Sequence, residues 1–149
     1  MLFRSNILDY GSGSGILGIA AKKLMPYSKI TLIDNDNLAV KMSKFNLKKN
    51  NIISNNNVLE VSSKKRKHIK KNFYNLIFAN ILLPQLKSLI KEFTYILDHN
   101  GFLIVSGILI YQKNHLINLY RKFKIYPVKI SEEEKWITIT FKKKNEKAH

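Results

Sequence analysis

A glycine-rich run near the start of the chain, DYGSGSG at residues 9–15, limits the possible folds more than any other feature. It follows the apolar residues 6–9 and precedes an amphipathic segment at residues 15–25. Alternating glycines permit positive φ angles and let a ligand approach the main chain closely. The run therefore predicts a tight strand-to-helix turn that binds a ligand at the carboxyl end of a parallel strand.

The rest of the chain repeats this alternation of short apolar segments and amphipathic segments. We expect strands at residues 6–9, 30–33, 58–61, 76–79 and 102–105, and helices at residues 15–25, from residue 36, and at residues 86–97 and 116–123. The dipeptide at residues 100–101 is expected to end the third helix. The apolar faces predicted for the first two helices consist of Ile16, Ile19, Ala20 and Leu24, and of Leu38, Met42 and Phe45.

Strands separated by helices predict an α/β fold, with a mostly parallel sheet and helices on both faces. Residues 137–141 alternate apolar and polar side chains, which is typical of a half-buried strand in a closing antiparallel pair. The polar tail at residues 142–149 is expected to be frayed. No Pro- or Gly-rich linker divides the chain, so we expect one domain over residues 1–149.

The chain carries a net charge of +16, from 26 Lys and Arg against 10 Asp and Glu. This charge is consistent with an acidic partner such as RNA or a ribosomal surface. It is also what an A+T-rich genome would encode, and the scarcity of arginine beside abundant lysine favours this second interpretation. The basic run at residues 62–71 is open to the same two interpretations, a phosphate-binding patch or a solvated loop.

Composition also excludes some classes of site. The chain has no cysteine, which rules out disulfides and thiolate metal sites, and its four histidines are far apart, so we expect no metal. No apolar run approaches the roughly 18 residues that a membrane span needs. We expect a cytoplasmic protein without a membrane anchor.

The acidic residues around the glycine run indicate which ligand it binds. Asp9 can meet an ammonium group, and the positive end of the following helix suits a carboxylate, while Gly11 and Gly13 can lie against the ligand. Asp34 ends the second strand, where it can accept both ribose hydroxyls, whereas Asp36 is better placed as a helix cap. An ammonium, a carboxylate and a ribose together indicate S-adenosylmethionine.

A dinucleotide is the alternative, because residues 13–18 also fit the pattern G-x-G-x-x-G with Asp34 about 20 residues further on. Two residues argue against it. Asp9 has no role in binding a pyrophosphate, and Asn80 is an unusual polar residue at the end of a strand in a nicotinamide-binding fold. We therefore favour S-adenosylmethionine.

Further segments resemble the lysine methyltransferases of ribosomal large-subunit protein L-eleven. These segments are ANIL at residues 79–82, SGIL at 106–109, IDND at 33–36 and EEKW at 133–136, together with the glycine run. The resemblance implies a Rossmann-like class I methyltransferase fold with a mostly parallel seven-stranded sheet and a C-terminal antiparallel strand. It also implies transfer of a methyl group from S-adenosylmethionine to lysine or N-terminal amines, with Asn80 contacting both amine and cofactor.

That family has an N-terminal substrate-recognition domain and a Gly/Thr-rich segment before its first strand, and this sequence shows neither. We therefore expect the catalytic domain alone, acting as a monomer on a ribosomal large-subunit protein. Two alternatives stay open. One is an RNA or DNA amine methyltransferase, which the missing Pro-Pro-aromatic unit after Asn80 disfavours, and the other is a cofactor-binding module without turnover.

Overall fold

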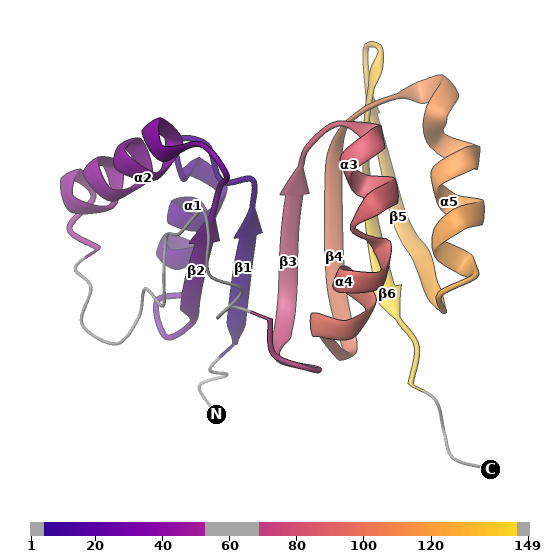
Figure 1. The fold of residues 1–149 in the computed structure, drawn as a ribbon, viewed down its shortest axis with the longest axis horizontal. Helices are drawn as coiled ribbons and strands as arrows, with labels where there is room; N and C mark the ends of the chain where they lie inside the picture. Colours follow the sequence, from indigo (N-terminus) through magenta and orange to yellow (C-terminus); the bar gives the residue numbers. More distant parts are fainter. Residues whose placement is uncertain (1–4, 53–68, 146–149) are drawn as a thin grey trace.

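Six strands form one mixed sheet in the order β2-β1-β3-β4-β6-β5 (Figure 1). The computed structural model describes residues 5–52 and 69–145. The strands are β1 (Asn6–Tyr10), β2 (Lys29–Ile33), β3 (Tyr74–Asn80), β4 (Leu97–Leu109), β5 (Ile125–Glu133) and β6 (Trp136–Lys143). The helices are α1 (Ile16–Leu24), α2 (Asn37–Lys49), α3 (Leu83–Ser88), α4 (Ile90–Ile96), the short 3-10 helix η2 (Ile110–Gln112) and α5 (Lys113–Arg121).

The pairing of the strands confirms the expected α/β sheet. Strands β2, β1, β3 and β4 pair in parallel, and β6 pairs antiparallel with both β4 and β5. The antiparallel pair β5–β6 needs only a tight turn, in which Glu134 adopts a positive φ of 53°. The described sheet has six strands instead of the expected seven, and the strand predicted at residues 58–61 lies outside the described residues.

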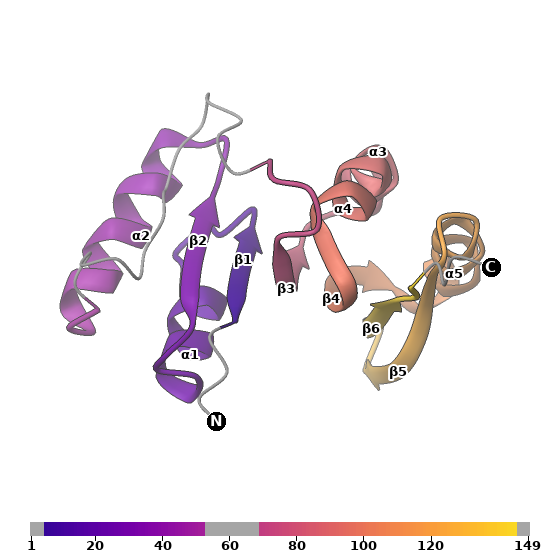
Figure 2. The same cartoon turned by 90° about the horizontal axis from the view of Figure 1, so that it is seen from below.

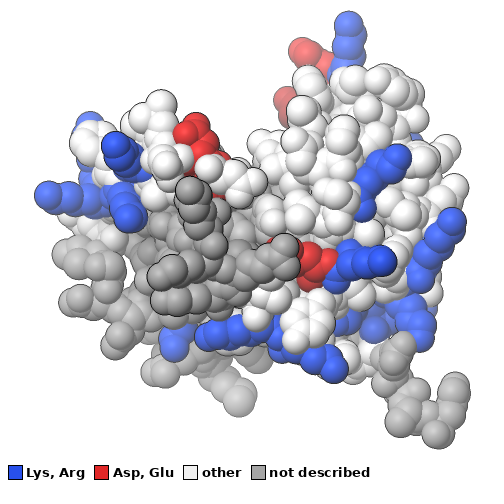
Figure 3. Space-filling model, in the orientation of Figure 1, with Lys and Arg blue, Asp and Glu red and all other residues white. Residues whose placement is uncertain are grey.

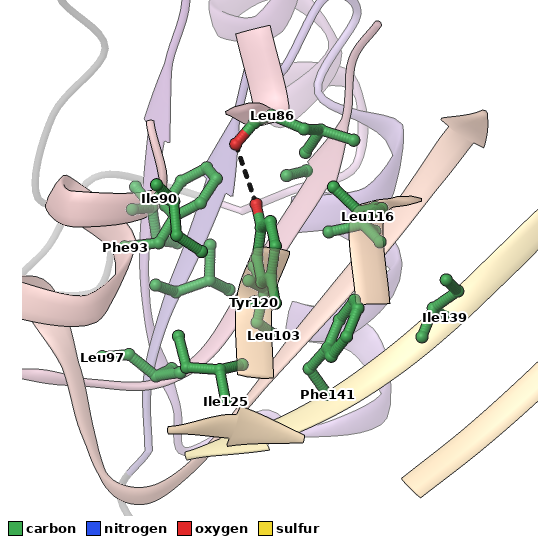
Figure 4. Close-up of a cluster of buried hydrophobic side chains, with 14 of the residues drawn as sticks. Leu86, Ile90, Phe93, Leu97, Leu103, Leu116, Tyr120, Ile125, Ile139 and Phe141 are labelled. Atoms are coloured by element: carbon green, nitrogen blue, oxygen red, sulfur yellow. Dashed lines mark hydrogen bonds between the residues drawn. The ribbon is translucent and has the colours of Figure 1, made fainter. Parts of the chain in front are cut away.

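Helices cover both faces of the sheet, as the alternating pattern predicts. Figure 2 shows α1 and α2 on one face, and α3, α4 and α5 on the other. The larger apolar core lies between the sheet and α3, α4 and α5 (Figure 4), and a smaller core lies beneath α1 and α2.

Tyr120 is fully buried in the larger core (Figure 4). Its hydroxyl donates a hydrogen bond of 3.0 Å to the Leu86 carbonyl oxygen, which joins α5 to α3. Its ring stacks on Phe141 of β6, with ring centroids 4.9 Å apart. Burial raises the pKa of the Tyr120 hydroxyl, so the group stays protonated and remains a donor.

The predicted apolar face of α1 is wrong except for Ile19. Ile16 and Leu24 are 68% and 82% exposed, and the buried residues of the helix include Gly18 and Lys22 instead. The helix turns this side inward because Gly18 packs closely against β2: a Cβ there would lie 3.2 Å from the Leu32 side chain.

The predicted apolar face of α2 is also wrong. Leu38, Met42 and Phe45 are 65%, 44% and 53% exposed, whereas Ser43 and Leu47 are buried. This helix packs on the loop between β1 and α1 through polar side chains, so apolar spacing does not identify its inner face.

Other element boundaries also differ from those expected. The single helix predicted at residues 86–97 is divided at Leu89 into α3 and α4. The helix ends at Ile96, and Asn100, with a φ of 61°, lies within β4. The tail is not frayed at its start, because Lys142 and Lys143 belong to β6, while residues 146–149 lie outside the described residues.

Within residues 5–52 and 69–145, no helix is both long enough and apolar enough to span a membrane.

We predict that Tyr120→Phe lowers the free energy of unfolding by about 1–3 kcal/mol, because the buried Leu86 carbonyl loses its donor. Urea denaturation followed by circular dichroism measures this change. Tyr111→Phe is the matched control, because Tyr111 is 79% exposed. The control should alter stability by less than about 0.5 kcal/mol. Equal stability of the two variants would show that the hydroxyl does not tie α5 to α3.

Candidate functional site

The glycine turn between β1 and α1 is attached to the end of β2 by backbone hydrogen bonds. Gly11 N and Ser12 N both donate to the Ile33 carbonyl oxygen, at 2.8 and 3.0 Å. Gly13 N donates to Asp34 Oδ2 at 2.8 Å. The turn is therefore held in one conformation by the strand next to it.

The glycines are required for this conformation, as the sequence predicts. Gly11, Gly13 and Gly15 adopt positive φ angles of 69°, 54° and 81°. A Cβ at Gly11 would lie 2.6 Å from Ile81 Cγ2, so the turn packs directly on the segment that follows β3. A Cβ at Gly13 would meet no atom of the described residues within 4 Å. Gly13 therefore borders open space, where a ligand can lie against the main chain.

Asp34 lies at the end of β2 and is partly buried. Its Oδ2 accepts from Gly13 N, and its Oδ1 accepts from Asp36 N at 2.9 Å. A carboxylate has about four acceptor positions, so both oxygens can still accept a hydrogen bond from a ligand.

Asp36 has a different position, as the sequence predicts. It is the N-cap of α2, and its Oδ1 accepts from Leu38 N at 2.8 Å. Its carboxylate thus satisfies an unpaired backbone donor at the start of the helix.

Two polar side chains of α2 donate hydrogen bonds to the glycine turn, and the sequence analysis predicted neither. Ser43 Oγ donates to the Gly13 carbonyl oxygen at 2.9 Å, and Asn46 Nδ2 donates to the Ser14 carbonyl oxygen at 2.9 Å. Ser43 is fully buried. Their spacing in the sequence could have indicated this role, because polar residues three positions apart lie on the same side of a helix and can satisfy the carbonyl groups of an adjacent turn.

Asp9 lies near the end of β1 and is only 3% exposed. Its Oδ2 accepts a hydrogen bond of 2.9 Å from Gly18 N, in the first turn of α1. Burial raises the pKa of Asp9 to about 6, the Gly18 hydrogen bond opposes this rise, and the negative charge of Asp34 adds to it. Asp9 thus carries an energetically costly negative charge, which a nearby ligand cation would stabilise.

Asn80 is exposed at the end of β3, beside Ser106 of β4. Ser106 Oγ donates to Asn80 Oδ1 at 3.1 Å, which orients the amide. Gly107 has a φ of 80°, and a Cβ there would lie 2.8 Å from Asn80 Oδ1. The segments at residues 79–82 and 106–109, which the sequence singles out separately, therefore fit against each other.

The sheet register brings all these residues to one edge. Asp9 pairs with Leu32 of β2 on one side and with Phe78 of β3 on the other. Asp34 and Asn80 each lie two residues beyond those partners, so they flank the glycine turn. The structure thus places every predicted site residue at the carboxyl end of the parallel strands.

Among residues 5–52 and 69–145, no group of three or more His, Asp or Glu side chains could hold a metal ion.

Comparison with known proteins identifies relatives along the whole chain. Residues 2–144 match the family model described as ribosomal protein L11 methyltransferase (PrmA). The ribosomal protein L11 methyltransferase of Prochlorococcus marinus (strain MIT 9515) is 37% identical over 145 residues, which cover 95% of this chain and 48% of that protein. That of Agrobacterium fabrum (strain C58) is 34% identical over 143 residues, with coverages of 93% and 47%. The chain therefore spans about half the length of these relatives.

Solved structures with a similar fold agree with this assignment. The ribosomal protein L11 methylase from Lactobacillus delbrueckii subsp. bulgaricus superposes with a TM-score of 0.83 at 25% identity, covering 97% of this chain and 72% of that one. The precorrin-6y C5,15-methyltransferase from Geobacter metallireducens GS-15, at 15% identity and a TM-score of 0.76, covers 95% of this chain and 81% of that one, and it shares the fold alone. The glycine turn, the sheet and the matched family model lead to one conclusion: the chain belongs to the ribosomal protein L11 methyltransferase family and has the Rossmann-like α/β fold of methyltransferases.

Proposed function

We propose that this chain is a catalytic domain that binds S-adenosylmethionine and transfers its methyl group to an amine of a large-subunit ribosomal protein. The observation that supports this most is that the glycine turn, Asp34 and Asn80 meet at one edge of the sheet, in a chain that belongs to the ribosomal protein L11 methyltransferase family. The names of the relatives supply the substrate class. A ribosomal-protein substrate implies action in the cytoplasm, and we expect a monomer.

The residues at the glycine turn fit this cofactor. The open space at Gly13 admits a ligand against the backbone, and the amino end of α1 favours its carboxylate. Asp9 would meet the ammonium group, whose charge would offset the cost of ionising a buried carboxylate. Asp34 would accept both ribose hydroxyls with its remaining lone pairs. When bound, the cofactor supplies a methyl group on a positively charged sulfur.

Asn80 would position the amine that receives the methyl group. Its Oδ1 accepts one hydrogen bond from Ser106 and can accept a second from an amine N–H, which would direct the nitrogen lone pair toward the site. The amine must arrive neutral, and free lysine has a pKa of about 10.4. Removal from water lowers that pKa, and holding the reactants in alignment accounts for most of the catalysis in this scheme.

A nucleic-acid amine is the second candidate acceptor, but the residues after Asn80 disfavour it. Ile81 and Leu82 follow Asn80, and neither offers an aromatic ring on which a flipped base could stack.

The proposal predicts that the chain, mixed with ribosomal protein L11 and S-adenosylmethionine labelled in its methyl group, transfers label to the protein. Asn80→Ala should lower the rate by at least about tenfold because the amine loses its acceptor, with little change in the melting temperature. Leu82→Ala, at a neighbouring residue that is 60% exposed, is the control. Label that appears only in ribosomal RNA, or full activity of Asn80→Ala, would contradict the proposal.

We predict that Asp34→Ala weakens cofactor affinity by at least about a hundredfold, because the ribose hydroxyls lose their acceptor and the turn loses its bond to Gly13. Isothermal titration calorimetry measures this affinity. Asp36→Ala is the matched control: it should cost about 1 kcal/mol of stability through loss of the helix cap and leave affinity almost unchanged. If Asp36→Ala weakened binding as much as Asp34→Ala, the ribose acceptor would be misassigned.

The pKa of Asp9 predicts how cofactor binding depends on pH. Since that pKa is about 6 in the folded chain, affinity should fall as the pH drops from 7.5 to 5, because protonation removes the charge that meets the ammonium. Asp9→Asn should bind weakly at both pH values and lose this dependence.

The thermal stability of Asp9→Asn distinguishes a role of Asp9 in cofactor binding from a purely structural role. The folded pKa lies above the model value of 3.8, so ionised Asp9 destabilises the fold at pH 7.5, and this cost disappears as the pH falls through about 6 toward 4. Asp9→Asn should therefore melt no lower than wild type at pH 7.5. A wild-type affinity that is constant between pH 7.5 and 5 would remove Asp9 from the cofactor site.

A further inference from the structure

The sheet face that carries Asn80 continues across β4 to the β5–β6 hairpin. Side chains alternate between the two faces along a strand, and Ala79 of β3 and Ile137 of β6 both belong to the larger core. Their neighbours Asn80 and Trp136 therefore lie on the opposite face. Among the described helices, those on this face are α1, which packs on β1 and β2, and α2, which packs on α1 (Figure 2). The part of the face at the hairpin is accessible, and Trp136 is 51% exposed.

Glu133 and Trp136 form a cross-strand pair at the tip of this hairpin. Glu133 is the last residue of β5, and it pairs with Trp136, the first residue of β6. Directly opposite residues of an antiparallel pair point to the same face, with Cβ atoms about 4.5–5.5 Å apart. Glu133 is exposed, and it forms no ion pair within residues 5–52 and 69–145. An indole beside an unpaired carboxylate can bind a cation through the ring face and the negative charge together.

The charge around this pair favours a cationic partner. Glu133 belongs to a run of three glutamates at residues 132–134, in a chain with only 10 Asp and Glu against 26 Lys and Arg. Figure 3 shows acidic atoms at the end of the hairpin that projects from the upper edge in Figure 1. Glu132 lies on the other face, where its Oε1 is 2.8 Å from Lys113 Nζ of α5. Glu133 thus stays available to a partner that approaches the face of Asn80.

The strand register gives the separation between Asn80 and Trp136. Asn80 pairs with Ser106 of β4, and Leu109, three residues further along β4, pairs with Trp136. With neighbouring strands about 4.8 Å apart and a rise of about 3.3 Å per residue, the two Cα atoms are separated by roughly 14 Å. An extended peptide covers this distance in about four residues, and residues four positions apart point to the same side.

We propose that Glu133 and Trp136 bind a second basic side chain of the substrate, about four residues from the amine that Asn80 positions. This inference rests on the proposed function, because it takes Asn80 as the place of the methyl acceptor. The second cation would lie on the face of the indole while its charge meets the Glu133 carboxylate. The pair would thus select one lysine among many by the side chain four positions away.

Trp136 is the single tryptophan of the chain, so its fluorescence reports binding at this pair directly. The probe is a nine-residue glycine peptide with two lysines four positions apart, titrated into the full chain at about 25 mM salt, where screening is weak. We expect a saturable change in emission. A peptide of the same charge with its two lysines adjacent should need at least about a threefold higher concentration, because it cannot reach both positions.

Variants of the two glutamates separate a local contact from general attraction. Glu133→Gln should weaken binding of the spaced peptide by about threefold, because the ion pair is lost. Glu134→Gln is the matched control, since it removes the same charge from a turn residue that is not paired with Trp136. The control should change affinity by less than about 1.5-fold. In the transfer assay, Glu133→Gln should raise the KM of the spaced peptide by about threefold and leave kcat within about 1.5-fold.

A second pair of variants tests the ring, with a fluorescein-labelled spaced peptide followed by anisotropy. Trp136→Leu should lower affinity by about threefold, because an exposed cation–π contact is lost. Tyr27→Leu alters a 56% exposed tyrosine between α1 and β2, away from the hairpin, and it should leave affinity unchanged.

Three results would overturn the proposal: equal affinity for the spaced and adjacent peptides, equal losses in the Glu133 and Glu134 variants, or an emission change with a 12-nucleotide RNA strand but not with the peptide. Failure of the proposed function is distinguishable. A chain that binds the spaced peptide as expected but transfers no methyl group would refute methyl transfer and leave the binding at Trp136 intact. Methylation of ribosomal protein L11 without any change in tryptophan emission would do the reverse.

Discussion

The hydrogen bonds that attach the glycine turn to the end of β2 are the constraint on which the candidate site depends. Gly11, Ser12 and Gly13 donate from the main chain to Ile33 and Asp34, so the turn keeps its shape only while β1 and β2 stay in register. The glycine turn leads directly into α1, and the buried carboxylate of Asp9 accepts a hydrogen bond from Gly18 N at the start of that helix. The edge where we propose cofactor binding and the packing of the first β–α–β unit therefore depend on the same hydrogen-bond network.

A second set of contacts explains why the segments at residues 79–82 and 106–109 occur together in this sequence. Asn80 occupies the space that a side chain at residue 107 would need, and Ser106 donates to its amide oxygen. The pair of parallel strands β3 and β4 thus builds a preorganised amide beside the glycine turn. The same face of the sheet continues through β4 to Trp136 of β6, so the hairpin extends the edge where we propose methyl transfer.

Much of the fold could be predicted, but the orientation of the helices could not. The order and type of the predicted strands outside residues 53–68 are correct, because each is a short apolar run with turn residues at its ends. The faces of α1 and α2 were misassigned because Gly18, Ser43 and Asn46 pack against the sheet and the turn through close approach and hydrogen bonds. Apolar periodicity carries no signal for contacts of this kind.

The sequence by itself determined the glycine turn, the acids around it, Asn80 and the alternation of strands and helices. These features are local: they depend on backbone freedom at glycine and on the period of apolar residues. Only the tertiary structure decided which groups act together, namely Ser43 with Gly13, Ser106 with Asn80, and Trp136 with the sheet face that carries Asn80. Such arrangements bring together residues distant along the chain, and strand register and helix packing set them because no local pattern encodes them.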